Sequence, residues 1–435
     1  QTEEKNPMGH NVLDIEDNQL IQSIDRLCSR IAVMDESLKV FVPGTFQPSA
    51  IRAQAEALIS HYPNPNARPP LFGLTVGIKD IFHCDGFTTR CGSDLPPDLF
   101  QGAEAELVRR LKAAGTIIMG KTATTEFAYF APAPTVNPQD PARTPGGSSS
   151  GSAAGAAAGF FALGLGSQTV GSIIRPAAYC GVVGFKPSLG RVSTTGVVPF
   201  SQTVDHAGFF SSTVAELEPV MKAINDAWQP AFAPGKIRLG IPRGIYLEQA
   251  EPAALEAFWD QIRQLEASCC TIVEIPIFDD ILAINERHGR LIAGEMARVH
   301  AQWFEAQREG YRHATRDIIL RGLTVDNAEL DELRRSCIDL RKTLEAAMHA
   351  HDIDAWVCPS TTDEAPLGLG STGSPLMNLP WTHSGLPAIT LPAGRGTAGL
   401  PLGLQLIGGF MADEALLALA GRVETIDFAR SVDVF

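Results

Sequence analysis

Apolar residues recur at helical spacing in several stretches of the chain. In residues 17–35 the apolar side chains that would share one face of a helix are Leu20, Ile21, Ile24, Leu27 and Ile31. Similar patterns predict helices over residues 48–60, 104–114, 152–163, 213–226, 252–267, 283–308, 325–351 and 412–425. Short apolar runs between them predict strands over residues 71–80, 116–119, 237–241, 271–275 and 355–358, with one more within 164–190 and two within 386–406.

Strands that alternate with helices are typical of α/β proteins built on a largely parallel sheet. We therefore predict a single large α/β domain over residues 11–435, after a polar tail at residues 1–10. Its central β-sheet is expected to be mixed and mostly parallel, with helices on both faces. Residues 283–351 are rich in charge and poor in glycine, which indicates a helical cover over the core.

The composition limits the classes of partner. The chain has 435 residues, of which 45% are hydrophobic, and 35 Lys and Arg against 49 Asp and Glu give a net charge of −14. An acidic surface repels phosphate groups and anionic lipids, so neither nucleic acid nor a membrane is expected as a partner. The longest apolar stretch has 14 residues, at 153–166, and a membrane span needs about 20. Because residues 1–10 lack the apolar core of a secretory signal, a cytoplasmic location is expected.

Cysteine and histidine give no sign of a metal site. The eight cysteines are dispersed without a CxxC pair, and the ten histidines include no HExxH motif. We expect no disulfide framework, no metal and no cofactor.

Three motif matches lack the structural context that their chemistry requires. Residues 115–122 fit the Walker A pattern, but the four variable positions read TIIM and a predicted helix precedes the first glycine. Residues 368–373 fit GxGxxG between two prolines. Residues 147–151 fit the nucleophile elbow GxSxG, yet a loop precedes them where the elbow needs a strand. We therefore favour a core strand for the first match and loops for the other two.

Two loops rich in glycine and hydroxyl side chains are better candidates for chemistry. Residues 145–152 read PGGSSSGS, and residues 166–172 read GSQTVGS. Glycine beside a reactive serine lets backbone N–H groups approach a developing oxyanion. A serine nucleophile needs a base, and Lys79, at the end of a predicted strand, is the candidate we favour. At its reference pKa a lysine is neutral in only about one molecule in 2500 at pH 7, so burial would have to lower the pKa of Lys79.

The chain resembles the amidase signature family over nearly its whole length. The matching segments are GIKD at 77–80, GKT at 120–122 with EFA at 126–128, residues 143–154, residues 166–186, GLPAI at 385–389 and GLPLGLQ at 399–405. This resemblance implies the amidase signature fold and a Ser–cis-Ser–Lys triad that works without a cofactor. Ser172 would be the nucleophile, Ser148, preceded by a cis peptide bond, the bridging serine, and Lys79 the base. The implied oxyanion hole consists of the backbone N–H groups of Thr169, Val170, Gly171 and Ser172.

The second loop departs from the commonest family pattern, which has Asp four residues before the nucleophile and Arg two after it. Here these positions hold Gln168 and Ile174, and Arg175 follows. The variant resembles that of malonamidase and related small-amide hydrolases, which implies an arginine that binds a substrate carboxylate. Arg175 is therefore a candidate clamp for an acidic amide. A purely structural role for Arg175 stands as an equal alternative.

Other charged residues near these motifs are expected to have structural roles. Asp205 is expected to fix a loop rather than to take part in catalysis. Lys121 and Lys186 are expected to pair with carboxylates or to extend their amines towards water.

These features predict a hydrolase that cleaves the C–N bond of a small or medium amide through an acyl-enzyme on Ser172. The substrate class extends to acidic amides, carbamates and urea-type compounds, with water as the second substrate. The alternative is the transamidating subunit of a tRNA-dependent amidotransferase. Such subunits usually have the Asp/Arg version of the second loop, and Gln168 and Ile174 contradict that pattern. The sequence leaves the oligomeric state open, a homodimer included.

Overall fold

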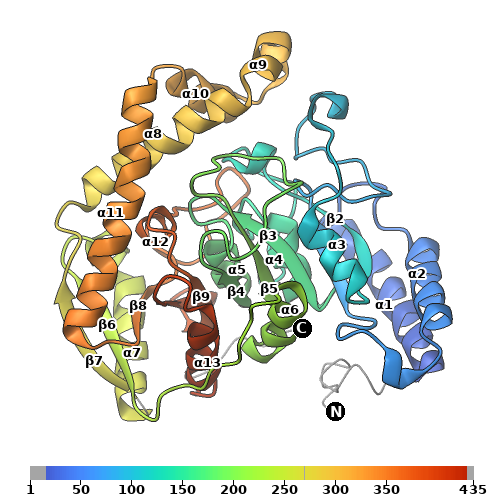
Figure 1. Cartoon of the computed structure of the whole chain (residues 1–435), viewed down its shortest axis with the longest axis horizontal. Coiled ribbons are helices and arrows are strands. Elements are labelled where there is room, and N and C mark those ends of the chain that lie inside the picture. Colours follow the sequence, from blue (N-terminus) through green and yellow to red (C-terminus); the bar gives the residue numbers. More distant parts are fainter. Residues whose placement is uncertain (1–15, 269, 429–435) are drawn as a thin grey trace.

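A ten-stranded sheet crosses the molecule from β2 to β7 (Figure 1). The computed structural model describes residues 16–268 and 270–428, so the polar tail predicted at residues 1–10 lies outside the described residues. The strands are β1 (Thr75–Lys79), β2 (Ile117–Thr122), β3 (Leu163–Gln168), β4 (Val183–Lys186), β5 (His206–Ser211), β6 (Ile237–Arg243), β7 (Cys270–Pro276), β8 (Ala355–Pro359), β9 (Ala388–Arg395) and β10 (Pro401–Ile407).

The sheet is mixed, as predicted, but it is not mostly parallel. Its order is β2-β1-β3-β5-β4-β9-β10-β8-β6-β7. Four of the nine pairs are parallel, β1 with β2, β1 with β3, β6 with β7 and β6 with β8, and the other five are antiparallel. The prediction of a mostly parallel sheet was wrong for two reasons. The unpredicted strand β5 lies antiparallel between β3 and β4, and the two C-terminal runs form the β9–β10 hairpin.

Most helices follow the predicted ranges. They are α1 (Asp17–Leu38), α2 (Pro48–His61), α3 (Glu106–Ala113), α4 (Ser150–Ala157), α5 (Ile174–Cys180), α6 (Leu217–Ile224), α7 (Pro252–Ser268), α8 (Ile281–Val299), α9 (Ala301–Gln307), α10 (His313–Gly322), α11 (Asn327–His351), α12 (Leu379–His383) and α13 (Asp413–Glu424). The helix predicted over residues 283–308 is divided at His300 into α8 and α9. The short helices α5 and α12 were not predicted, because seven and five residues are too few for a helical period to be recognised. Helix α10 was also missed, since it lies between the predicted helices 283–308 and 325–351.

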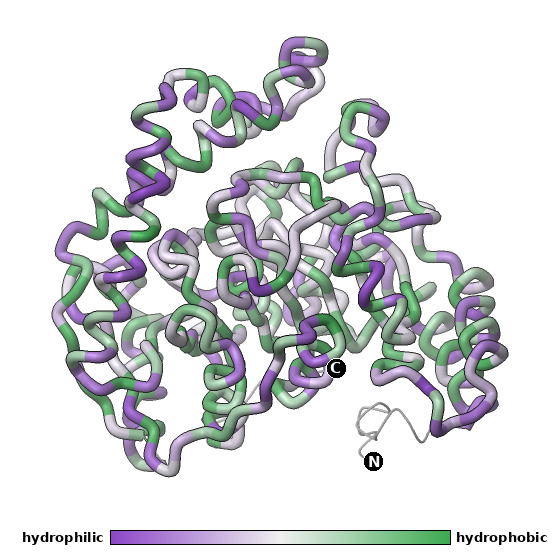
Figure 2. The backbone as a smooth tube through the Cα atoms, viewed as in Figure 1, coloured by the Kyte–Doolittle hydropathy of each residue, from purple (hydrophilic) through white to green (hydrophobic). Residues whose placement is uncertain are grey.

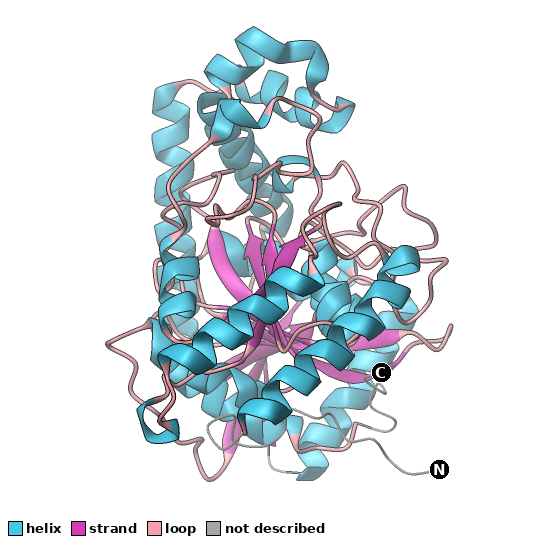
Figure 3. Ribbon diagram, turned by 90° about the vertical axis from the view of Figure 1, so that its right-hand side faces the viewer, coloured by secondary structure: helices cyan, strands magenta, loops and turns pink. Residues whose placement is uncertain are grey.

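Helices enclose the sheet on both faces (Figure 3). Neighbouring residues of one strand point to opposite faces, and the two hydrophobic cores follow this rule. Ile118 of β2 and Phe209 of β5 belong to the larger core, whereas Ile117 and Phe210 join α1, α2 and α4 in the smaller one. Hydrophilic and hydrophobic residues alternate along α8 and α11 (Figure 2), so each of these helices buries one side. Among the described residues, no helix combines the length and the hydrophobicity that a membrane span requires.

Helix α4 lies unusually close to the sheet because it contains no side chain larger than serine. A Cβ atom added at Gly155 would lie 2.3 Å from Cζ of Phe161, and one added at Gly77 in β1 would lie 2.4 Å from Cε1 of the same ring. A Cβ atom at Gly164 in β3 would lie 2.9 Å from the Ser152 carbonyl oxygen. This packing brings the residues before α4, Ser148 among them, to the ends of β1 and β3.

We expect Gly155→Ala to lower the free energy of unfolding by about 1–3 kcal/mol, because the core must accept a methyl group without space for it. Chemical denaturation measures the change. Gly289→Ala in α8 is the matched control, since a Cβ atom there would meet no atom within 4 Å. That variant should gain about 0.5–1 kcal/mol from the better helix former. Equal stabilities of the Gly155 variant and the wild type would refute the close packing of α4.

Candidate active site

The predicted site residues come together where two parallel strands end. Strand β1 ends at Lys79, and its parallel neighbour β3 ends at Gln168. The carboxyl ends of parallel strands meet at the same edge of a sheet, which is where α/β proteins place their ligands. Ser148 reaches this edge from the segment before α4, and Ser172 reaches it from the segment between β3 and α5.

Lys79 is completely buried and has two hydroxyl partners. Its Nζ lies 2.7 Å from Oγ of Ser148 and 2.7 Å from Oγ of Ser167. Burial lowers the pKa of Lys79 well below its usual value, and the negative charge of Asp205 only partly opposes this shift. Within the described part of the chain, Lys79 forms no ion pair with a carboxylate. Burial therefore favours the uncharged form of the amine, in which it can accept a proton, more than water would.

Lys121, on the adjacent strand β2, is a useful contrast. It is equally buried, but its Nζ lies 2.8 Å from Oδ1 of Asp80 and donates to Oγ1 of Thr89 at 2.9 Å. The carboxylate next to Lys79 in the sequence thus serves the other lysine, in agreement with the pairing expected for Lys121.

The peptide bond between Gly147 and Ser148 is cis, as the family resemblance implied. Its carbonyl oxygen accepts a hydrogen bond from Nη2 of Arg175 at 2.6 Å. The neighbouring serines are fixed as well, since Ser149 donates to the Ser167 carbonyl and Ser150 to the Gly146 carbonyl. The Gly/Ser run is therefore an ordered segment and not a flexible linker.

Ser172 faces the same small pocket as Ser148. The pocket is lined by Ala128, Tyr129, Phe130, Ser148, Thr169, Val170, Ser172, Arg175, Phe200 and Pro375. Lys79 and Ser148 are in direct hydrogen-bond contact, whereas among the described residues the Ser172 hydroxyl forms no hydrogen bond. The structure thus brings the three residues of the predicted triad to one site, with the Ser148–Ser172 contact left open.

The backbone between Thr169 and Ser172 is held from behind. The Thr169 carbonyl accepts from Nε2 of His288 at 3.0 Å, the Val170 carbonyl from Oγ1 of Thr382 at 2.6 Å, and the Gly171 carbonyl from the Arg175 N–H at 3.0 Å. In a trans peptide the N–H points opposite to the C=O. The N–H groups of Val170, Gly171 and Ser172 therefore point away from these partners, and within the described residues they donate no hydrogen bond. They are available for an oxyanion.

Gln168 stabilises this segment without a charge. Its Oε1 accepts from the N–H groups of Ile173 at 2.8 Å and Ile174 at 3.0 Å, and its Nε2 donates to Oγ1 of Thr382 at 2.9 Å. A neutral amide can both accept and donate in this position, so no positively charged partner is needed at position 174.

Arg175 combines the two roles that the sequence left open. Nη1 donates to the Gly373 carbonyl and Nη2 to the Gly147 carbonyl, each at 2.6 Å, which ties two loops together. Arg175 also lines the pocket beside Ser172, and its Cζ lies 5.8 Å from the centre of the Phe130 ring. Burial lowers the pKa of Arg175 to about 10, so it stays positive at neutral pH, and among the described residues no carboxylate pairs with it. The site therefore contains a buried positive charge without a counter-ion.

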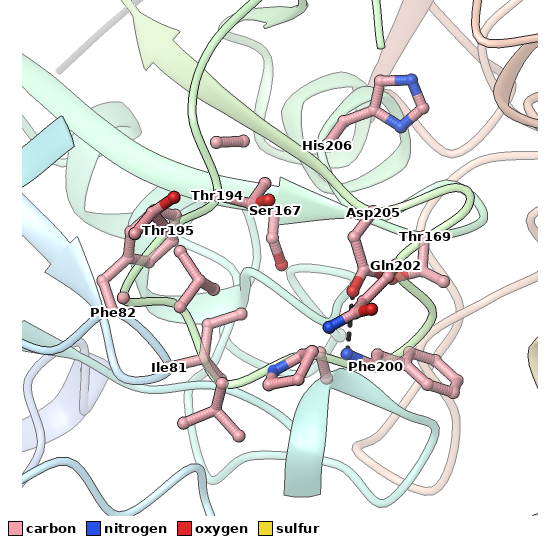
Figure 4. Close-up of a pocket in the computed structure, with 16 residues that line it drawn as sticks. Ile81, Phe82, Ser167, Thr169, Thr194, Thr195, Phe200, Gln202, Asp205 and His206 are labelled. Atoms are coloured by element: carbon pink, nitrogen blue, oxygen red, sulfur yellow. Dashed lines mark hydrogen bonds between the residues drawn. The ribbon is translucent and has the colours of Figure 1, made fainter. Parts of the chain in front are cut away.

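A larger pocket adjoins the first one. It has a volume of about 320 Å³ and shares Ala128, Thr169 and Phe200 with its neighbour. Figure 4 shows Ile81, Phe82 and Thr195 on the wall opposite Asp205 and Gln202. Asp205 accepts from the Thr169 hydroxyl at 2.6 Å and from the N–H groups of Phe200 and Ser201 at 2.8 and 2.9 Å. These contacts agree with the expected loop-fixing role of Asp205.

Ser167 is the residue of this site that the sequence analysis did not single out. Its hydroxyl is the second partner of Lys79, and it also lines the larger pocket. The available signal was its position in β3, one residue before the end of the strand that pairs with β1. Neither a motif nor a spacing distinguishes it from the other serines, so the register of the sheet was needed.

Comparison with known proteins gives the family. The family model described as Amidase matches residues 22–417, and the chain belongs to this family. A glutamyl-tRNA(Gln) amidotransferase subunit from Synechococcus sp. (strain RCC307) is 30% identical over 450 residues, covering 92% of each chain. A crystal structure of an amidase has a TM-score of 0.84 at 29% identity, covering 94% of this chain and 96% of that one.

A chain from a vestigial protein complex connected with the origins of an s-triazine catabolic enzyme has a TM-score of 0.82 at 28% identity. The match covers 93% of this chain and 94% of the chain from that complex. The chain is thus an amidase-signature enzyme, of the class that acts on amide C–N bonds as a hydrolase or an amidotransferase.

Lys79 and Lys121, which are buried on neighbouring strands, should respond in opposite ways to substitution by methionine. Lys121→Met leaves the Asp80 carboxylate buried without its partner and should lower the free energy of unfolding by about 3–5 kcal/mol. Lys79→Met leaves no carboxylate unpaired, and its stability should equal or exceed that of the wild type while activity is lost. Thermal and chemical denaturation test both expectations.

The pH dependence gives a second readout for Lys79. Its pKa is lowered in the folded state from 10.5, so the unfolded chain binds the extra proton and wild-type stability rises with pH over the interval between the two pKa values. Any advantage of Lys79→Met in stability should therefore shrink as the pH approaches 10. If the stability advantage of Lys79→Met over the wild type grew with pH, the buried amine would have to be charged.

Proposed function

We propose that the chain hydrolyses the C–N bond of a small or medium amide, with Ser172 as nucleophile, Ser148 as bridging serine and Lys79 as base. The observation that carries the proposal is the contact of the completely buried Lys79, whose Nζ lies 2.7 Å from Oγ of Ser148 and whose pKa burial lowers well below its usual value. The availability of the Ser172 hydroxyl in the pocket beside Ser148 supports the same assignment.

In this mechanism Ser172 Oγ attacks the amide carbonyl carbon. The Ser172 proton passes to Ser148 as the proton of Ser148 passes to Nζ of Lys79. The negative oxygen of the tetrahedral intermediate is stabilised by the N–H groups of the segment from Thr169 to Ser172. The proton then returns by the same route to the nitrogen, the C–N bond breaks and the amine leaves. Water attacks the acyl-enzyme in turn, and the carboxylic acid is released with Ser172 restored.

Arg175 supports an acidic amide as the preferred substrate. A buried guanidinium without a counter-ion favours the binding of an anion that neutralises its charge. A substrate carboxylate can do this through a short, charge-assisted hydrogen bond. The adjoining pocket of about 320 Å³ has space for a small substrate. Carbamates and urea-type compounds present the same carbonyl to Ser172, and we include them in the substrate class.

The second candidate is the transamidating subunit of a tRNA-dependent amidotransferase. The similarity to a glutamyl-tRNA(Gln) amidotransferase subunit over 92% of the chain favours it. Such a subunit would release ammonia from an amide within a complex, so its activity would depend on a partner. Gln168 and Ile174 speak against it, since the usual Asp/Arg pair of those subunits is replaced by a neutral amide bound to backbone N–H groups.

Ser172→Ala and Lys79→Ala should each abolish turnover of amides by the chain purified alone. Hydroxylamine added to the wild-type reaction should give a hydroxamate, because it intercepts the acyl-enzyme. The kcat/KM of the wild type should fall at acidic pH as Lys79 gains a proton. Ser384→Ala, which removes a buried hydroxyl bonded to the Trp381 carbonyl, is the control and should keep activity.

The outcomes separate the candidates. Wild-type rates in the Ser172 or Lys79 variant would exclude the triad, and a missing hydroxamate would argue against the acyl-enzyme. Turnover only in the presence of a partner protein and aminoacyl-tRNA would favour the amidotransferase.

Arg175→Ala should reduce kcat/KM for the monoamide of a dicarboxylic acid about 10–100-fold more than for the corresponding diamide, as expected for a lost charge-assisted hydrogen bond. The diamide is needed as a reference because the variant also loses the contact with the Gly147 carbonyl. Arg143→Ala, whose guanidinium donates to the Ala365 carbonyl outside both pockets, should leave the ratio unchanged. Equal losses on both substrates would assign Arg175 a structural role alone.

A further inference from the structure

Helix α8 contacts the segment that would form the oxyanion hole. His288 lies on its inner face, is fully buried, and its Nε2 lies 3.0 Å from the Thr169 carbonyl oxygen. Its Nδ1 lies 3.2 Å from Nδ1 of His383 in α12. The Nε2 of His383 lies 2.8 Å from Oγ of Ser336 in α11. Two imidazoles thus connect the helices outside the sheet with the backbone beside Ser172.

The protonation of both rings follows from their partners. A carbonyl oxygen only accepts, so Nε2 of His288 carries the hydrogen. Burial lowers the pKa of His288 to about 4 and that of His383 to about 2, so both rings are neutral at pH 7 and each carries one N–H. Nδ1 of His288 is then an acceptor, and the hydrogen between the rings belongs to Nδ1 of His383. Nε2 of His383 then carries no hydrogen, and the Ser336 hydroxyl beside it donates to the Leu333 carbonyl at 2.6 Å.

The contact acts on the peptide group between Thr169 and Val170. Because the peptide is planar and trans, fixing the carbonyl of Thr169 also fixes the direction of the Val170 N–H, which points the opposite way. An N–H that is aimed at an oxyanion before the reaction is worth more than one that must reorient during it. A loop with free rotation at this peptide would lose that advantage.

We propose that His288, oriented by His383, is a positioning residue that aims the Val170 N–H at the oxyanion formed on Ser172. This inference rests on the proposed acyl-enzyme mechanism. A second connection from the same helix face supports it. Glu295, two turns after His288, accepts from Ser201 Oγ at 2.7 Å and from the Thr203 N–H at 3.0 Å. These residues belong to the loop that Asp205 ties to the Thr169 hydroxyl.

The tautomers can be tested independently of activity. In the full-length protein labelled with ¹⁵N-histidine, NMR at pH 7 should show His288 protonated at Nε2 and His383 protonated at Nδ1, and the His288→Leu and His383→Leu variants assign the signals. A His288 ring protonated at Nδ1 alone would leave no donor for the Thr169 carbonyl and would overturn the proposal.

The role in catalysis is tested with the amide that the wild type hydrolyses. His288→Leu should lower kcat about 10–100-fold, and KM should change less than about threefold. This fall in kcat should not exceed the fall caused by removing a whole oxyanion donor. His288→Gln, whose side-chain N–H can occupy the place of Nε2, should recover kcat to within about fivefold of the wild type. Thermal unfolding identifies any variant that does not fold.

His300→Leu is the matched control. His300 is also a fully buried imidazole, at the end of α8, but its Nδ1 pairs with the Tyr311 hydroxyl at 2.9 Å. This variant should lose stability without the fall in kcat. A folded His288→Leu enzyme with wild-type kcat, or a His300→Leu enzyme with an equal fall, would overturn the positioning role. If the wild type hydrolysed no amide, the proposed function would be contradicted, and so would the catalytic role of His288. The NMR experiment would still test the contact between His288 and the Thr169 carbonyl.

Discussion

The hydrogen bond between Lys79 and Ser148 depends on the exclusion of water and of charge from one end of the sheet. Lysine is usually protonated, and enclosure without a carboxylate partner lowers the pKa of this amine and so favours its neutral form. Much of the surrounding structure serves this condition. Asp80 is engaged by Lys121, α4 is built from small residues so that it seals the sheet closely, and hydroxyl groups rather than ions satisfy the amine. The chemistry of the site is thus a consequence of packing.

A second constraint concerns the backbone around the two serines. Hydrogen bonds from Arg175, Thr382 and His288 each end on a carbonyl oxygen of the two glycine-rich segments. These donors come from three different helices, α5, α12 and α8, so the geometry of the loops is determined by tertiary structure rather than by their own sequence. This explains how segments with the composition of a linker can hold a defined conformation.

Much of this arrangement could be predicted from the sequence, for identifiable reasons. The amphipathic helices and the strand that ends at Lys79 follow from the spacing of their apolar residues, and the motifs around Ser148 and Ser172 are specific enough to indicate the family. The antiparallel centre of the sheet was missed because β5 carries the sequence HAGFFS, without the alternation that marks a half-buried strand. The roles of Ser167 and His288 could not be predicted, because each depends on contacts between elements distant in sequence. For Lys121 the sequence indicated only that some carboxylate would pair with it, and the sheet register was needed to identify Asp80.

The double engagement of Arg175 limits how an enzyme of this design can change its selectivity. Arg175 donates to the Gly147 carbonyl and also lines the pocket, so replacing it changes the backbone beside Ser148 together with the charge at the pocket. New selectivity would have to arise from neighbours that touch the pocket without supporting the backbone, such as Phe130, whose ring is partly exposed over the same cation. Diversification in such a lineage is therefore expected to proceed around the arginine rather than through it.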